Sequence, residues 1–219
     1  MKEFKPYLSP TELIDSDHPE IAAFSQKVAS NEKSEIAVAC KLFNVVRDKI
    51  SYNPYTYFYK RSHYKASNVL KQKNGYCVSK ACLLCALGRA AGIPTRLGLA
   101  DIRNHGASQD IIDMMGTDIF TYHGYVEFFL NGKWIKATPA FDRPVYKKHR
   151  IPVLTFDGQQ DAVFPARNLD GNPYVEYLKY HGTYADLPFD DIVKGFRSVY
   201  GDERVDLWIQ MLESELENN

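Results

Sequence analysis

The sequence predicts an α+β fold, and three local patterns predict it. A helix is expected to begin at Cys77, a β-hairpin is expected to turn at Asn131-Gly132, and several other segments follow the helical period. Separate helical segments and an antiparallel hairpin are typical of the α+β class. The 219 residues, 45% of them hydrophobic, suffice for one buried core. No repeat or composition shift marks a boundary, so a single domain over residues 1–219 is expected.

Two helices near the N-terminus are predicted by their first residues. Asp17 can serve as an Asx cap and Pro19 falls in the first turn, so a helix is expected to begin there. A longer helix is expected from Ser34. Its apolar residues recur at the helical spacing: Ile36, Cys40, Phe43, Val46 and Ile50. Residues 66–73 are expected to form a short helix that leads into the next motif.

The segment that begins at Cys77 is predicted to be a buried helix with a sharp end. Gly75 permits a tight approach turn, and the alanines and leucines that follow supply an apolar body. Gly92 is a natural C-terminal cap, and Pro94 prevents the helix from continuing.

A cysteine at the start of a helix has surroundings that favour a nucleophile. The first amides of a helix lack intrahelical partners and the dipole is positive there, so we expect a depressed pKa for Cys77. Its backbone amide is a natural donor to an oxyanion, while the sequence does not reveal a second donor. The alternative is that Cys77 is a small buried residue that precedes a core helix.

The hairpin is predicted by Asn131-Gly132, the strongest two-residue turn signal. The flanking segments YHGYVEFFL and KWIKAT are strand-prone. A two-residue loop pairs Leu130 with Lys133. The register then places an aromatic pair and an opposite-charge pair across the hairpin: Phe129 with Trp134, and Glu127 with Lys136.

His123 lies near the far end of the first hairpin strand and is the candidate partner of the cysteine. If the register continues, His123 faces Ala140 on the side that carries those two pairs. A lone histidine on a strand is more often structural than catalytic, but here it accompanies a candidate nucleophile.

The remaining segments are predicted to form scaffold. A strand is expected over residues 93–102 and a short helix over 108–115, and two helices are expected over 188–200 and 202–217. The aromatic-rich stretch 53–64 could line a substrate cleft, although a loop packed over the helices is the favoured interpretation.

Charge and composition exclude several classes of function. The 27 basic and 27 acidic residues cancel, so the sequence does not indicate a nucleic-acid partner or an anionic membrane surface. The opening MKEFKPYLSP contains no apolar run of a secretory signal, and no stretch reaches the roughly 20 apolar residues of a membrane span. A cytoplasmic protein is therefore expected.

The four cysteines do not form a convincing metal or disulfide pattern. Cys77, Cys82 and Cys85 have a spacing known from iron–sulfur ligands, but the segment is helix-prone and the remaining Cys40 lies upstream. Cys82 and Cys85 are expected to be small core residues. A disulfide framework is not expected in a chain without a signal, and no metal or cofactor is expected.

These motifs resemble those of the transglutaminase-like family, a branch of the papain-like cysteine enzymes. The family has a G-x-C at a helix start, an A-x-L-L-x-A-L-x-R-A-x-G-I-P run, and a strand that begins H-x-x-x-E before a hairpin and a tryptophan. The matching positions are Gly75, Cys77, Ala81, Leu83, Leu84, Ala86, Leu87, Arg89, Gly92, Ile93, Pro94, His123, Glu127 and Trp134. The resemblance covers about residues 35–142, and a weaker likeness of the flanking segments extends it to most of the chain.

The resemblance implies a papain-like fold in which the helix of Cys77 packs on an antiparallel sheet, with extra helices at both ends and a C-terminal elaboration over about 186–217. It also implies a Cys-His-Asp triad. The family aspartate normally falls four residues after the hairpin tryptophan, where this chain has Thr138. Strand alternation makes Asp142 our first candidate for the acid that orients His123, unless the two nearby prolines break the register.

Two other residues are candidates for that orienting role. Asp157, in the later FDG, is the reserve acid, and the Thr138 hydroxyl is a third possibility. The function implied is acyl transfer on an amide through a thioester at Cys77, with hydrolysis of a peptide, protein or small amide favoured over cross-linking. The alternative is a catalytically inactive domain used for binding. The oligomeric state cannot be read from the sequence.

Overall fold

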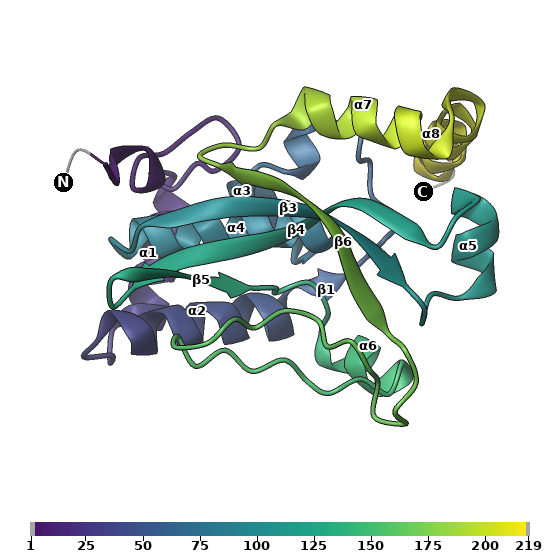
Figure 1. The fold of residues 1–219 in the computed structure, drawn as a ribbon. Helices are drawn as coiled ribbons and strands as arrows, with labels where there is room; N and C mark the ends of the chain where they lie inside the picture. The colour runs from purple at the N-terminus through teal and green to yellow at the C-terminus, as the bar shows by residue number, and fades with distance from the viewer. Residues whose placement is uncertain (1–2, 218–219) are drawn as a thin grey trace.

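The computed structural model describes residues 3–217 and has an α+β architecture, as the sequence predicted. The chain up to Ala90 is mainly helical, and the main sheet comes from the residues that follow (Figure 1). The N-terminal elements are η1 (Lys5–Tyr7), α1 (Pro19–Ala29), α2 (Glu35–Lys49), β1 (Ser51–Tyr52), η2 (Arg61–His63), α3 (Ala66–Gln72), β2 (Asn74–Gly75) and α4 (Cys77–Ala90). The later elements are β3 (Thr95–Asn104), α5 (Gln109–Met115), β4 (Ile119–Leu130), β5 (Lys133–Ala137), α6 (Arg143–Lys148), β6 (Val175–Tyr184), α7 (Phe189–Tyr200) and α8 (Asp202–Glu217).

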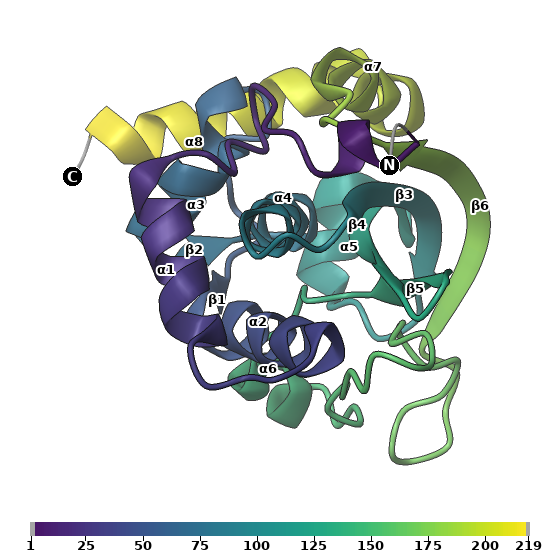
Figure 2. The ribbon, with the colours of Figure 1, turned by 90° about the vertical axis from the view of Figure 1, so that its left-hand side faces the viewer.

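Helix α4 lies at the centre of the molecule. It packs against β4 and β3 on one side and against α1, α2 and α3 on the other, so it is surrounded in the end-on view of Figure 2. Every residue from Val78 to Arg89 is buried. The helix is therefore buried on all sides, as expected of a core helix and unlike a surface helix. Its ends match the sequence prediction, because Gly92 follows it with a φ of 79°.

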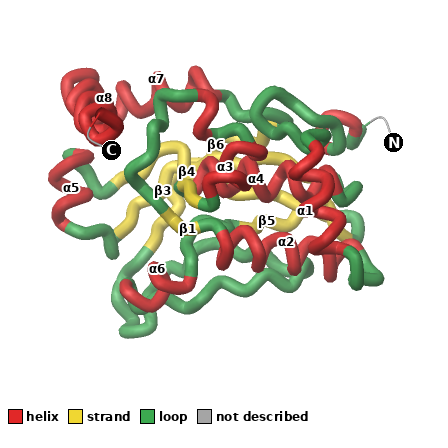
Figure 3. The backbone as a smooth tube through the Cα atoms, turned by 180° about the vertical axis from the view of Figure 1, so that it is seen from behind, coloured by secondary structure: helices red, strands yellow, loops and turns green. Residues whose placement is uncertain are grey.

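The main sheet is antiparallel with the order β5-β4-β3-β6. Helices α1 to α4 cover one face, as the view from behind shows (Figure 3), and α7 and α8 lie across one edge of the helical layer. The predicted strand over 93–102 is β3, and the predicted C-terminal helices are α7 and α8. Strand β6 was not predicted. Within residues 3–217, no helix combines the length and the apolar composition of a membrane span.

The hairpin register is confirmed near the turn. Leu130 pairs with Lys133, Phe129 with Trp134 and Glu127 with Lys136. The register does not continue as far as His123, because β5 ends at Ala137 and the Thr138 N–H turns to the carbonyl of Ala162, 2.9 Å away.

The expected pairing of His123 with Ala140 is therefore wrong. His123 instead pairs with Ala100 of β3. The chain leaves the sheet after Ala137 and then enters α6, whose first turn contains Pro144. An N-cap aspartate followed by proline in the first turn starts a helix, and this local signal overrides the extension of the strand.

Candidate active site

Cys77 is the first residue of α4 and is held there by a small β-bridge. The parallel pair β1 and β2 joins Tyr52 to Gly75, two residues before the cysteine. The Tyr76 N–H, at the N-cap, donates to Ser79 Oγ at 3.0 Å, which satisfies one of the free amides at the helix start. The cysteine is thus placed at the head of a rigid, buried helix.

His123 is brought to Cys77 by the glycine that follows it. Gly124 lies so close to the first turn of α4 that an added Cβ would be 2.7 Å from Val78 Cα and 3.2 Å from the carbonyl oxygen of Cys77. Only a residue without a side chain permits this approach of strand to helix. As a result, the side chains of Cys77 and His123 line the same cavity of about 100 Å³.

Burial dominates the electrostatics of this pair. Cys77 is only partly exposed, and burial raises the pKa of its thiol to about 11, although the backbone amides of Gly124 and Val78 act in the opposite direction. Burial lowers the pKa of His123 to about 3. Both groups are therefore neutral near neutral pH, and the expected depression of the Cys77 pKa is wrong in this structure: desolvation outweighs the helix terminus.

Neither predicted acid contacts the imidazole. The two carboxylate oxygens of Asp142 accept the N–H of Tyr52 at 2.8 Å and that of Val145 at 3.1 Å, so this residue ties β1 to the start of α6. Asp157 is exposed and accepts the amides of the next turn, from Gln159 and Gln160. Strand alternation was expected to place Asp142 beside His123, but that argument required a hairpin register that does not extend so far. The orienting role of Asp142 therefore stays a prediction.

The groups that the structure places around the imidazole are aromatic rings. Its ring centroid lies 5.2 Å from that of Phe164 and 6.3 Å from that of Tyr177. Thr138 is fully buried beside Tyr177, where its hydroxyl favours the ionised form of the phenol. Within the described residues, His123 Nε2 and Thr138 Oγ1 are both enclosed without a hydrogen-bond partner of good geometry. Tyr177 was not identified from the sequence because β6 was not predicted.

The residue before His123 has a strained backbone. Tyr122 has a φ of 55°, which is rare for a residue with a large side chain. Asp101 Oδ1 accepts the Tyr122 N–H at 3.1 Å and the Thr121 hydroxyl at 2.5 Å, and it lies 2.7 Å from His181 Nε2. The His181 ring stacks on the Tyr122 ring with centroids 4.2 Å apart. This cluster holds the backbone conformation that directs the next side chain.

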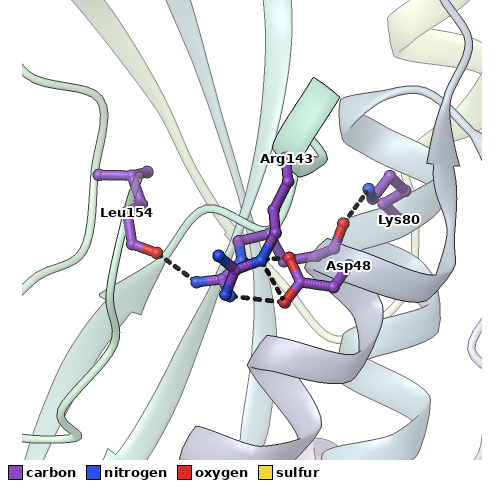
Figure 4. A network of polar contacts seen from close by, with 5 residues as sticks. Asp48, Lys80, Arg143 and Leu154 are labelled. Carbon is purple, nitrogen blue, oxygen red and sulfur yellow. Dashed lines mark hydrogen bonds and ion pairs between the residues drawn. The ribbon is translucent and has the colours of Figure 1, made fainter. Parts of the chain in front are cut away.

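A second buried polar network anchors α4 from behind. Lys80, one turn after Cys77, is fully buried, and its Nζ donates to the carbonyl of Arg47 at 3.2 Å (Figure 4). The same Nζ donates to the carbonyl of Ile50 at 2.5 Å. Arg47 is paired with Asp48, which also receives Arg143. Burial lowers the pKa of Lys80 to about 7. The ammonium caps the C-terminal end of α2 and fixes α4 against it.

The other cysteines are placed as the sequence predicted. Cys82 and Cys85 are fully buried in the core. Burial raises the pKa of Cys85 to about 12. Within the aromatic-rich stretch 53–64, Tyr55 and Phe58 line the cavity of Cys77, so the cleft-lining interpretation holds for these two residues.

The fold is similar to that of a proposed cysteine protease of known structure. A proposed cysteine protease from Cytophaga hutchinsonii superposes with a TM-score of 0.51 at 15% identity, over 84% of this chain and 55% of that one. A proposed protease from Parabacteroides distasonis (TM-score 0.40, 17% identity, 62% of this chain and 25% of that one) and the periplasmic domain of TgpA from Pseudomonas aeruginosa (TM-score 0.40, 18% identity, 59% and 43%) are more distant. The chain thus spans about half the length of the first of these proteins.

The sequence comparison is more specific than the structural one. No curated protein sequence matches the chain significantly. The family model of the Transglutaminase-like superfamily matches residues 22–139, which include Cys77 and His123. The match covers more than half of the chain and the central helix and hairpin of the fold, and so the chain belongs to the transglutaminase-like superfamily.

Proposed function

We propose that the protein is a thiol-dependent acyl-transfer enzyme that acts on an amide bond, with Cys77 as the nucleophile and His123 as the general base. The observation that carries this proposal is the approach of Gly124 to the first turn of α4, which places both side chains on one cavity. The buried, partnerless Nε2 of His123 adds support, because a purely structural histidine normally has its ring nitrogens satisfied.

The neutral state of the pair sets the order of the steps. Because the reaction starts from a neutral thiol and a neutral imidazole, the proton passes from Cys77 Sγ to His123 at the same time as the sulfur attacks the amide carbonyl carbon. The amides of Cys77, Val78 and Gly124 are suited to stabilise negative charge near the sulfur, since those of Gly124 and Val78 already favour the thiolate.

The imidazolium then returns its proton to the leaving nitrogen as the carbon–nitrogen bond breaks, which leaves a thioester on Cys77. Water attacks the thioester, His123 accepts the proton of that water, and the carboxylic acid departs as the thiol reforms. We favour hydrolysis over cross-linking because the cavity is small and the described site has no feature that selects an amine over water.

A second candidate function is supported by one observation. Among the described residues, no carboxylate contacts His123, and its pKa is shifted by burial alone. A domain that has lost the orienting acid could bind a peptide without cleaving it.

Labelling with an electrophilic substrate mimic separates the two candidates. An N-acetyl-phenylalanyl chloromethyl ketone presents a carbonyl beside its leaving group, and Cys77 is expected to be alkylated faster than Cys40, Cys82 and Cys85, as mapped by peptide mass spectrometry. Cleavage of fluorogenic amides should be lost in Cys77→Ala. Labelling of Cys77 with no detectable cleavage of any amide would favour the binding domain, and a protein whose Cys77 is unreactive would contradict the enzyme proposal.

A further inference from the structure

We infer that the acyl part of the substrate carries an uncharged, apolar side chain, which occupies the cavity beside Cys77 under the C-terminal helices. The inference rests on the proposed function and names the substrate class for the same site. It is carried by the chemistry of the cavity wall, which differs from that of the surface around it.

The cavity wall is apolar and uncharged. Among the side chains that the structure describes, none of those lining the cavity belongs to Asp, Glu, Lys or Arg. The part of the wall that comes from α5, α7 and α8 is aromatic, aliphatic or thioether in character. Seven residues form this part: Ile111, Met114 and Met115 from α5, Phe196 and Tyr200 from α7, and Trp208 and Leu212 from α8.

This composition decides which side chains can enter. A charged group in such a cavity would lose its hydration and find no opposite charge, which is strongly unfavourable. An apolar side chain of suitable size would instead exchange water for close contacts. A cavity of about 100 Å³ is large enough for a group of several heavy atoms, since an engineered apolar cavity of comparable size in another protein binds benzene.

Helices α7 and α8, which form part of the wall, are held by hydrogen bonds and ring contacts to the elements that surround Cys77 and His123. The Thr121 N–H, two residues before His123, donates to the hydroxyl of Tyr200 at 2.9 Å. Trp208 Nε1 donates to the sulfur of Met114 at 2.6 Å, and its ring lies 5.7 Å from that of Phe58. Helices α7 and α8 therefore form a fixed side of the cavity.

These helices lie outside the matched family region. The family model ends at residue 139, whereas α7 and α8 span Phe189–Tyr200 and Asp202–Glu217. Cys77 and His123 come from the shared core, as does the part of the wall that α5 supplies, whereas Phe196, Tyr200, Trp208 and Leu212 come from the C-terminal addition. Helices added outside the shared core can therefore change which substrate side chain is accepted while the Cys-His pair stays the same.

A matched series of reagents tests the inference. N-acetyl-aminoacyl chloromethyl ketones with phenylalanyl, leucyl, lysyl and aspartyl side chains place the side chain on the carbon next to the attacked carbonyl. The second-order rate constant for alkylation of Cys77 is measured for each by mass spectrometry. The phenylalanyl or leucyl reagent is expected to react at least about tenfold faster than the lysyl and aspartyl reagents.

Two variants on α8 provide the matched comparison. Trp208→Ala removes part of the wall and is expected to lower the phenylalanyl rate by about tenfold, whereas Leu207→Ala, at a 61% exposed position outside the cavity, should not change it. The rate with iodoacetamide, which has no side chain, should be the same in both. If Trp208→Ala does not fold by circular dichroism, Ile111→Ala at the partly exposed end of α5 replaces it.

The outcomes separate this inference from the proposed function. Equal rates for all four reagents in the unmodified protein, or the same profile for Trp208→Ala and Leu207→Ala, would overturn the apolar side-chain inference while leaving Cys77 as the nucleophile. A folded protein whose Cys77 reacts with none of the reagents, iodoacetamide included, would overturn both.

Discussion

Two histidines on the same sheet have opposite environments. His123 is buried and lines the same cavity as Cys77, and its Nε2 has no partner among the described residues. His181 lies 2.7 Å from the carboxylate of Asp101 but has no thiol beside it. Burial alone would raise the pKa of Asp101, yet hydrogen bonds from Thr121 and His181 outweigh it and lower that pKa.

This difference indicates that His181 has a positioning role, whereas His123 is the histidine that can take part in the reaction. The satisfied pair of Asp101 and His181 fixes the backbone of Tyr122, and a satisfied polar cluster rigidifies its surroundings. The unsatisfied His123 is free to accept a proton when a substrate arrives. If this comparison is correct, each histidine should fail in its own way when it is removed.

The largest effect is expected at His123. His123→Ala removes the general base, and amide turnover should fall by about a thousandfold, within the range that a positioned base contributes. The rate of alkylation of Cys77 by iodoacetamide should change by less than about threefold, because the resting thiol does not depend on an ion pair. His181→Ala is the matched control, and an equal loss of turnover in both variants would remove the distinction between them.

A smaller, mixed effect is expected at Asp101. Asp101→Asn weakens the charge-assisted contacts to Tyr122, Thr121 and His181, so the free energy of unfolding should fall by about 2 kcal/mol. Turnover should fall by about tenfold because the support of His123 is loosened. Urea unfolding and steady-state kinetics measure the two quantities. Unchanged turnover with lowered stability would show that the cluster is structural only.

Lys80 is another buried titratable group, and it differs from His181 because its Nζ bonds to carbonyl oxygens and has no carboxylate partner within ion-pair distance in the part of the chain that the structure describes. Its pKa is about 7 in the folded protein against an ordinary 10.5, so between these values the unfolded chain binds more protons and stability should rise with pH. Below about pH 7 the ammonium must be charged while buried, and that gain is absent. Urea unfolding at about pH 6 and about pH 9 should show the rise.

The variant Lys80→Met should flatten this pH dependence, and Lys71→Met, at an exposed position on α3, should not. The same slope in the Lys80→Met and unmodified proteins would mean that Lys80 keeps an ordinary pKa.

The smallest effect on turnover is expected at the two candidates for orienting His123, Thr138 and Asp142. Thr138→Val removes the enclosed hydroxyl beside Tyr177 and should lower turnover by less than about tenfold with little loss of stability. Asp142→Asn should mainly lower stability, because it weakens contacts to the amides of Tyr52 and Val145. A loss of about a hundredfold in turnover at unchanged stability in Asp142→Asn would instead establish the acid expected from the sequence.

The parts of this site that were predictable are those encoded locally. The helix of Cys77 has its own turn, apolar body and stop signals, and Asn131-Gly132 fixes the nearby register. The end of the second hairpin strand was also encoded locally, because Asp142 followed by Pro144 is a helix start. The prediction instead extended the strand through these residues.

The rest of the site depends on contacts that no local pattern reveals. Asp101 and His181 are 80 residues apart and meet only when β3 pairs with β6. Tyr177 lies on the same unpredicted edge strand, whose outward residues carry little hydrophobic periodicity. The pKa of Cys77 was misjudged for a related reason: the helix terminus can be read from the sequence, whereas the extent of burial cannot.

The pH dependence of alkylation tests the central claim, that Cys77 and His123 form a neutral pair at rest. The rate constant for iodoacetamide at Cys77 is measured by mass spectrometry from about pH 5 to about pH 9. With a thiol pKa of about 11, the rate should rise about tenfold per pH unit across this range, because only the thiolate reacts. A rate that is already high at about pH 5 and constant above it would show a preformed thiolate–imidazolium pair and would contradict the account.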